Sequence, residues 1–380
     1  METIYLDHAA TTPMHPEVIR VMTDVMNDTF GNPSSIHLFG RAARKRIDDS
    51  RKALAESIGA SIDEIIFTSG GTEADNSAIF SSIQSMKDKG NHIITTEIEH
   101  HAVLHACEEL EKQGFVVTYL PVDKEGRVSV ESVREALRDE TILVTIMYGN
   151  NEVGTLQPIR EIGALLKDHQ ALFHTDAVQA YGAVPIDVAD LGVDFMSVSS
   201  HKINGPKGMG FLYAKKGIPF RPLLFGGEQE RKRRAGTENV AGAAGFAKAC
   251  EIIQETSEEK TAMYRKFKGK MISLFEESGI EFAINGNLEE SLPHVLNISF
   301  PGVSVESFLV NMDLAGIAVS SGSACTAGSI EPSHVLVAMF GKESERTRNS
   351  IRFSFGLNNT TEDIERAALT AIKVANRLTR

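Results

Sequence analysis

The sequence predicts an α/β fold in which helices cover both faces of a largely parallel sheet, followed by a smaller α+β unit. Short apolar runs alternate with amphipathic segments through the first part of the chain, which is the pattern of a buried parallel sheet. This regular alternation ends near residue 279. The chain, at 380 residues, is also longer than a single hydrophobic core usually supports.

The elements of the first part follow from the spacing of apolar residues. Helices are predicted over residues 14–28, 41–58, 101–113, 130–137 and 158–169, and another runs from a glycine turn to residue 83. Strands are predicted over residues 64–68, 92–95, 115–120, 141–147, 171–175, 193–198 and 209–214. Their order, strand then helix, is what parallel pairing requires.

A long, proline-free helix over residues 236–276 is expected to bridge to the second part. That part is predicted to hold strands at 281–284, 294–300 and 350–355, and helices at 304–315, 332–340 and 362–378. A short strand at 4–6 could join either unit. We therefore expect a large domain of residues 15–260 and a small domain made of residues 1–14 and 261–380.

Composition and charge argue against several classes of function. The formal net charge of −12 disfavours nonspecific binding to nucleic acid or to an anionic membrane. No apolar run is long enough to form a transmembrane helix, and the first residues lack the pattern of a signal peptide. Three cysteines cannot form a disulfide framework, so we expect the reducing cytoplasm.

Lys202 directly follows the apolar run at 193–198 and precedes a glycine-rich turn. Burying a lysine at the end of a strand is unfavourable unless the site uses the amine. One use is a Schiff base, because burial lowers the pKa of the amine and frees its lone pair. A surface lysine on a Gly-Pro turn is the plainer alternative.

Two other segments place polar residues at strand ends, where parallel sheets bind ligands. Thr72 follows glycines at the start of a helix, where free N–H groups suit a phosphate, although it could simply cap the helix. Asp176 could hold a pyridinium nitrogen, or serve as a helix cap or a structural ion pair. His174 shares its strand face, but a third metal ligand is lacking, so we expect no metal site.

A histidine and a cysteine offer proton transfer and nucleophilic attack. His100 follows a strand and could stack on a cofactor ring or move protons, and at most one of His100 and His101 is expected to function. Cys325 lies among serine, glycine and alanine, whose flexibility suits a nucleophile that moves. A surface turn and an inert loop thiol are the plainer alternatives. Cys107 and Cys250 are expected to be small buried residues.

Two arginine features have alternative explanations. Arg352 lies in a strand between apolar neighbours and needs an anion, either the carboxylate of a substrate or an internal Asp or Glu. The basic run at residues 231–234 is expected to be a solvated stretch, and a nucleic-acid patch is the less favoured reading.

Taken in order, these segments resemble the pyridoxal-phosphate-dependent cysteine desulfurases of the class with the longer catalytic loop. The resemblance covers nearly the whole chain. Its motifs are YLDHAATTP at 5–13, FGNPSS at 30–35, TSGGTE at 68–73, NNEVG at 150–154, SHK at 200–202, RAGTEN at 234–239, SGSACT at 321–326 and IRFS at 351–354. It implies the aspartate-aminotransferase-like fold (fold type I) with a seven-stranded sheet, and a homodimer.

The resemblance also implies a role for each matching residue. Lys202 matches the lysine that holds pyridoxal 5'-phosphate, Cys325 the nucleophile, carried by the small domain, and His100 a residue that stacks on the ring and moves protons. The remaining matches bind the ring nitrogen (Asp176), the ring hydroxyl (Gln179), the phosphate (Gly71, Thr72, Ser199, His201, and Thr237 from the neighbouring subunit) and the substrate carboxylate (Asn151, Arg352).

The activity implied is conversion of L-cysteine to L-alanine, with sulfur carried as a persulfide on Cys325 to an acceptor protein. No resident metal is implied, although a transient iron–sulfur cluster at Cys325 is compatible with it. The acceptor is expected to be an iron–sulfur scaffold or a tRNA-thiolation enzyme, without direct nucleic-acid or membrane binding. The chain lacks the longer C-terminal tail with which relatives dock the scaffold, which leaves the acceptor open.

Three alternatives are weighed against this activity. A selenocysteine lyase shares the fold. An aminotransferase needs no thiol, so Cys325 argues against it. A non-catalytic docking platform would not need Lys202, Asp176, His100 and Cys325 together.

Overall fold

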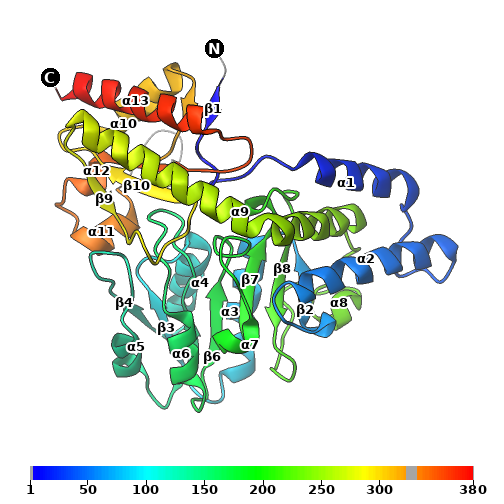
Figure 1. The fold of residues 1–380 in the computed structure, drawn as a ribbon. Coiled ribbons are helices and arrows are strands. Elements are labelled where there is room, and N and C mark those ends of the chain that lie inside the picture. The colour runs from blue at the N-terminus through cyan, green and yellow to red at the C-terminus, as the bar shows by residue number, and fades with distance from the viewer. Residues whose placement is uncertain (1–2, 322–331, 380) are drawn as a thin grey trace.

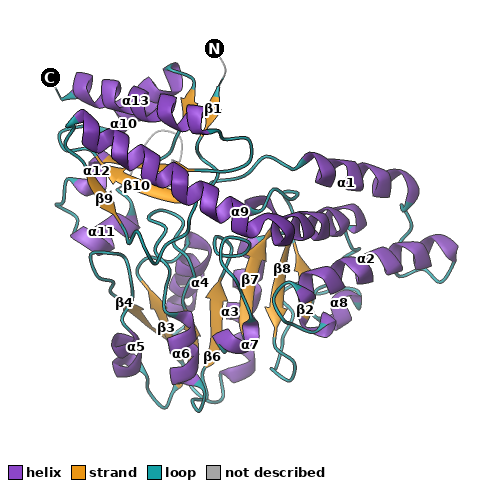
Figure 2. Cartoon of the chain, in the orientation of Figure 1, coloured by secondary structure: helices purple, strands orange, loops and turns teal. Residues whose placement is uncertain are grey.

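The computed structural model describes residues 3–321 and 332–379, and its largest feature is a seven-stranded sheet (Figures 1 and 2). The strand order is β2-β8-β7-β6-β5-β3-β4. Neighbours pair in parallel except at β8, which is antiparallel to both β2 and β7. The mostly parallel sheet is therefore confirmed. The strands are β2 (Ile65–Thr68), β3 (His92–Thr96), β4 (Val116–Leu120), β5 (Thr141–Thr145), β6 (Leu172–Asp176), β7 (Phe195–Ser199) and β8 (Gly210–Ala214).

Each face of this sheet has its own apolar core. Ile65 and Phe67 of β2 join one cluster and Ile66 joins the other, because successive side chains of a strand point to opposite faces. Burial on both faces explains the continuous apolar runs in the sequence. The Ile66 face is covered by α3 (Gly71–Met86) and α4 (His101–Lys112). The other face is covered by α2 (Leu38–Glu56), α5 (Val130–Ala136), α6 (Ile159–Leu166), α7 (Val188–Leu191) and the first half of α9 (Val240–Ser278).

A separate core, rich in phenylalanine, lies under a three-stranded antiparallel sheet in the order β12-β10-β9. The first strand, β1 (Ile4–Tyr5), pairs in parallel with β11 (Ile317–Ala318) and so joins this smaller unit. The other elements are β9 (Ala283–Asn285), β10 (Val295–Ser299), β12 (Ser350–Ser354), α1 (Pro16–Asp28), α8 (Gln229–Lys232), α10 (Val305–Leu314), α11 (His334–Phe340), α12 (Arg346–Asn349) and α13 (Thr361–Leu378).

The long helix α9 connects the two units, as its course from the large sheet toward α13 shows (Figure 1). Its first half contributes Phe246 to the large core, and its second half contributes Phe267 and Phe275 to the smaller one. The helix begins later than the sequence predicted because the side chain of Asn239 caps it by accepting from the N–H of Gly242. Within the described residues, no helix is both long and apolar enough to cross a membrane.

The basic run at residues 231–234 is not the freely solvated stretch that was expected. Arg234 forms an ion pair with Glu73 at 2.8 Å, and Arg233 donates to the carbonyl of Asp63. Arg231 also pairs with the carboxylate of Asp63. The prediction failed because the acidic partners come from a distant part of the chain, which only the folded structure brings near.

We expect Phe275→Ala to destabilise the smaller unit. Its ring is fully buried and packs edge-on against Phe300 at a centroid distance of 5.5 Å. Truncation removes apolar contacts and leaves a cavity, so the free energy of unfolding should fall by about 3–5 kcal/mol. Urea unfolding followed by circular dichroism measures this change. Leu369→Ala, on the exposed face of α13, is the matched control and should change the free energy of unfolding little. Equal effects of the two substitutions would contradict this picture of the core.

Candidate active site

A cavity of about 540 Å³ opens at the carboxyl ends of the parallel strands, and both units contribute to its walls. This is the position that ligands favour in parallel sheets, and the volume suits a cofactor-sized ligand. The cavity brings together ten predicted site residues, namely Gly71, Thr72, His100, Asn151, Asp176, Gln179, Ser199, His201, Lys202 and Arg352. Thr237 lies on an exposed loop outside the cavity, and Cys325 lies outside the described residues.

Lys202 occupies the short turn that follows β7, where the sequence placed it. Its Nζ donates to the carbonyls of Ala9 at 2.5 Å and Ala10 at 2.8 Å, so the N-terminal segment holds the amine in the cavity wall. Burial, and then the positive charge of Arg352, lowers the pKa of Lys202 to about 8. A sizeable fraction of the amine is therefore neutral near physiological pH, as a nucleophile or a base must be. The surface-lysine alternative is wrong.

Asp176 ends β6 and is almost fully buried beside the cavity. Its Oδ1 accepts from the backbone N–H of Val178 at 2.9 Å. Burial raises the pKa of Asp176, while His100 and Lys202 act in the opposite direction. The carboxyl group is therefore suited to share a proton with a basic ring nitrogen. Beneath it, burial lowers the pKa of His174 to about 3, so that histidine is a neutral part of the core.

His100 caps the N-terminus of α4 as well as lining the cavity. Its Nδ1 accepts from the N–H of Ala102 at 3.1 Å. The neutral ring therefore carries its proton on Nε2. Burial lowers the pKa of His100, which keeps the ring neutral at physiological pH. To take up a proton, Nδ1 must lose the hydrogen bond that it accepts from the N–H of Ala102.

Arg352 has an internal carboxylate partner, which was one of the two alternatives that the sequence left open. Its guanidinium is buried, with Nη2 donating to Asp7 Oδ1 and Nη1 to the carbonyl of Asn151, each at 2.7 Å. Its Nε is buried and has no hydrogen-bond partner among the described residues, although Arg352 lines the cavity. An unpaired buried donor on a cation is unfavourable. A substrate carboxylate at this edge of the guanidinium would supply the missing acceptor.

The opposite end of the cavity presents backbone donors to an anion. Gly70 caps α3 without a side-chain hydrogen bond, so Thr72 is not the cap residue and the first-turn N–H groups remain available. A Cβ on Gly71 would lie 2.7 Å from Val178 Cγ2, so a larger residue at position 71 would force the side chain of Val178 to shift. Burial, and then Lys202, lowers the pKa of His201 to about 4, so its neutral ring can donate to a phosphate. These features fit pyridoxal 5'-phosphate.

Sequence reasoning missed three buried acids around the same cavity. Asp75 lines the cavity one helical turn after Gly71, and burial followed by Asp176 raises its pKa. Glu99 precedes His100, and burial raises its pKa to about 8. Glu152 is buried, its pKa is raised by burial, and it accepts a hydrogen bond from Ser333. The four-residue spacing of Asp75 from Gly71 was a usable signal, since such residues share a helix face.

In the cofactor-free protein, we expect the amine of Lys202 to titrate near pH 8, because burial destabilises its charged form. Competitive labelling with trace acetic anhydride across pH 6–11, quantified by peptide mass spectrometry, measures this titration. The reference is Lys266 on the exposed side of α9. Labelling of Lys202 that rises at the same pH as that of Lys266 would contradict the assigned environment.

Comparison with known proteins agrees with this geometry. The Aminotransferase class-V family model matches residues 4–367. The chain is 62% identical over 379 residues, and 100% of both sequences, to a Bacillus subtilis (strain 168) protein named putative cysteine desulfurase IscS 1. It is 48% identical over 377 residues to a cysteine desulfurase IscS of Methanosarcina thermophila, covering 99% of this chain and 93% of that one.

Solved structures give the same relationship. A NifS-like protein matches with a TM-score of 0.92 at 36% identity, covering 99% of this chain and 100% of that one. A structure titled SspA in complex with cysteine matches with a TM-score of 0.80 at 35% identity, covering 93% of this chain and 99% of the other. The expected fold is confirmed. The chain belongs to the class-V aminotransferase family and, within it, to the pyridoxal-phosphate-dependent cysteine desulfurases.

Proposed function

We propose that the chain desulfurates free L-cysteine in the cavity described above, with the residue roles that the sequence predicted. The observation that carries this proposal is the convergence of Lys202, Asp176, His100 and Arg352 on one cavity. Pyridoxal 5'-phosphate, when bound, withdraws electrons from the α-carbon of the substrate. Asp176 holds its ring nitrogen, Gln179 its ring hydroxyl, and the cradle of Gly71, Thr72, Ser199 and His201 its phosphate. Lys202 would hold the cofactor through its Nζ.

Arg352 positions the substrate by donating a hydrogen bond from Nε to its carboxylate, beside Asn151. The released Nζ of Lys202 then takes the α-proton, which its lowered pKa permits near neutral pH. His100 would pack over the cofactor ring. It takes the proton of the substrate thiol at Nδ1, and this step breaks the hydrogen bond that Nδ1 accepts from the N–H of Ala102. The carbonyls of Ala9 and Ala10 then stabilise Lys202 in its protonated form.

Cys325 completes the reaction as the nucleophile. Its thiolate attacks the sulfur of the substrate, so that a sulfur–sulfur bond forms and the bond between Cβ and sulfur of the substrate breaks. The electron pair of the broken bond stays on Cβ, which takes up a proton and becomes a methyl group; Lys202 returns a proton to the α-carbon, and L-alanine leaves. Cys325 retains the sulfur as a persulfide and transfers it to an acceptor protein, either an iron–sulfur scaffold or a tRNA-thiolation enzyme.

We also infer a homodimer, in which Thr237 of each chain completes the phosphate site of the other. Large apolar side chains are exposed on the single chain, including Phe30 at 70%, Ile36 at 90% and Phe225 at 84%. Apolar groups of this size usually mark an interface. Thr237 itself is exposed in the single chain, as the proposed position requires.

Two further sequence predictions are kept as proposals. A boundary between the large and the small domain near residue 260 is supported by α9, whose halves join different cores. The reducing cytoplasm is supported by the buried, unpaired thiols of Cys107 and Cys250.

We expect Cys325→Ser to abolish formation of sulfide and alanine from L-cysteine, because serine cannot accept sulfur. The visible absorption of the bound cofactor should persist, since Cys325 takes no part in holding it. Alanine is measured by amino-acid analysis and sulfide by methylene blue, with Cys250→Ser as the matched control. If Cys325→Ser produced alanine and sulfide at the original rate, the nucleophile would be another group.

We expect His100→Ala to lower kcat by about 10²–10⁴-fold at neutral pH, the usual contribution of a general acid or base. Burial lowers the pKa of His100, so the ring of the native enzyme should stay neutral at pH values below the ordinary histidine pKa, and turnover should fall only in solution acidic enough to protonate it. Turnover measured from pH 5 to 9 tests both points. His105→Ala, on the exposed side of the same helix, is the control. Unchanged turnover in His100→Ala at neutral pH would remove the proton-transfer role.

A further inference from the structure

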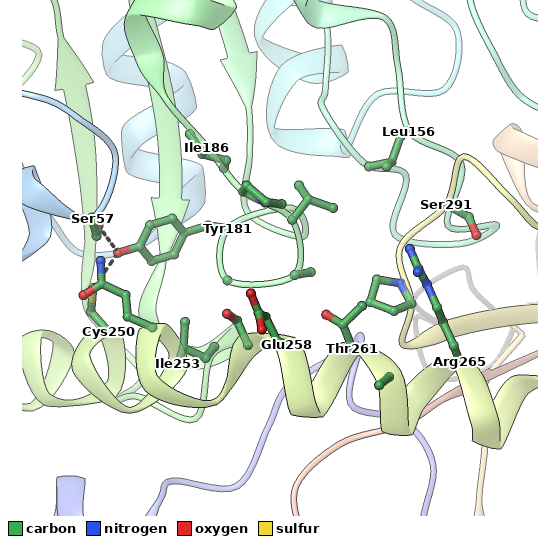
Figure 3. Close-up of a pocket in the computed structure, with 18 of the residues that line it drawn as sticks. Ser57, Leu156, Tyr181, Ile186, Cys250, Ile253, Glu258, Thr261, Arg265 and Ser291 are labelled. Carbon is green, nitrogen blue, oxygen red and sulfur yellow. Dashed lines mark hydrogen bonds between the residues drawn. The ribbon is translucent and has the colours of Figure 1, made fainter.

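A second cavity, of about 480 Å³, lies where the two units meet, and it shares no lining residue with the active-site cavity (Figure 3). Its floor is the middle of α9, from Cys250 to Arg265. One wall is the loop at residues 181–186, which follows β6, and the other is the segment at 289–293, which leads into β10. We call it the seam cavity. Nothing in the proposed desulfuration uses it.

One corner of the seam cavity is positively charged. Arg265 extends from α9 toward Ser291 (Figure 3) and forms no ion pair with any described residue. Lys268, one turn further along α9, is 7% exposed and donates to Ser291 Oγ at 3.1 Å and to the carbonyl of Leu292 at 3.0 Å. No carboxylate of the described residues pairs with it either. Lys268 lies behind Ser291 and is not part of the cavity lining, while Arg265 is exposed in it; together they make the electrostatic potential of this corner positive, which favours an anion.

The rest of the cavity has a different character. Glu258 points into it from α9, two helical turns before Arg265, and Glu289 belongs to the opposite wall (Figure 3). Neither carboxylate forms an ion pair among the described residues. Between and above these charges, the lining is apolar and aromatic, with Leu156, Tyr181, Ile186 and Ile253 as its main contributors. A ligand that matches the whole lining carries an anion, a cation and an apolar body.

The size of the cavity limits the kinds of ligand that can fill it. A ligand with only the two charged groups and no side chain would leave most of the apolar lining exposed to water, which is unfavourable in proportion to the exposed area. Glu258, Glu289 and Arg265 are exposed and need no counter-charge, but a simple carboxylate would make no favourable contact with the two glutamates, and a simple amine would make none with Arg265. The charge pattern and the volume together describe a zwitterion with a large apolar substituent.

We propose that the seam cavity binds a free α-amino acid with a large apolar side chain, such as leucine or phenylalanine. Its carboxylate lies at the corner of Arg265 and Ser291, its ammonium group faces Glu258, and its side chain contacts Ile186 and Ile253. Because the walls belong to both units, the bound amino acid contacts residues on either side of the seam.

The test uses isothermal titration calorimetry on the holoenzyme after borohydride reduction, which fixes the cofactor to Lys202 so that an added amino acid cannot react in the active site. L-Leucine should bind once per chain. Removing its ammonium group (4-methylpentanoate) or its carboxylate (3-methylbutylamine) should each weaken binding about tenfold or more, the size expected for losing a charge-assisted hydrogen bond.

Paired variants on α9 locate the site. Arg265→Gln and Glu258→Gln should each weaken L-leucine binding by about tenfold. Lys266→Gln and Glu259→Gln make the same charge changes at adjacent exposed positions outside the cavity and should leave binding unchanged. All four positions are exposed, and retained desulfurase activity confirms that each variant is folded.

Three outcomes would overturn the proposal. The first is the absence of saturable L-leucine binding to the native chain at millimolar concentration. The second is binding of 4-methylpentanoate as tight as that of L-leucine, which would indicate a plain anion site. The third is equal loss of binding in Arg265→Gln and Lys266→Gln, which would place the site elsewhere. None of these results bears on desulfuration, which Cys325→Ser tests separately.

Discussion

The N-terminal segment from Asp7 to Thr12 fixes the active-site geometry on which the rest of the structure depends. It runs from β1 in the smaller unit to the large sheet, and its backbone and side-chain groups form hydrogen bonds with both. Ala9 accepts from Lys202 and donates its N–H to the hydroxyl of Ser354, and Asp7 pairs with Arg352. The amine proposed to carry the cofactor and the guanidinium proposed to bind the substrate are therefore held in place by one short stretch.

This arrangement explains how several ionisable groups coexist in one cavity. Burial acts on all of them, raising the pKa of Asp176 and lowering those of His100 and Lys202. The opposite charges of Asp176 and Lys202 oppose that effect on each other. The balance leaves Lys202 with a pKa of about 8, well below that of an exposed amine. A lysine in water would be almost fully protonated at neutral pH and could serve neither as nucleophile nor as base.

Much of the fold was predictable because its signals are local. A strand buried on both faces is mostly apolar, so the run at 193–198 was recognisable as a strand, as was the glycine turn before α3. The candidate site followed because parallel strands place their carboxyl ends at one edge. Glu99 was missed because a single buried carboxylate has no distinctive sequence pattern, whereas the helical spacing of Asp75 from Gly71 was a signal that was not used. The ion pairs of Arg231 and Arg234 with distant partners were missed because ion pairs between remote segments carry no periodicity.

The sequence by itself therefore determined the alternation of strands and helices and the order of the motifs, and it predicts Lys202 as the cofactor lysine. Those features depend on residue type and spacing within a few residues of one another. Only the tertiary structure decided that Asp7 is the partner of Arg352, that His100 is bonded as a helix cap, and that an uncompensated charge pattern lines the seam between the units. These features depend on contacts between segments that are far apart in the chain, or on the orientation of a side chain in the folded protein. Local spacing in the sequence encodes neither the contacts nor the orientation.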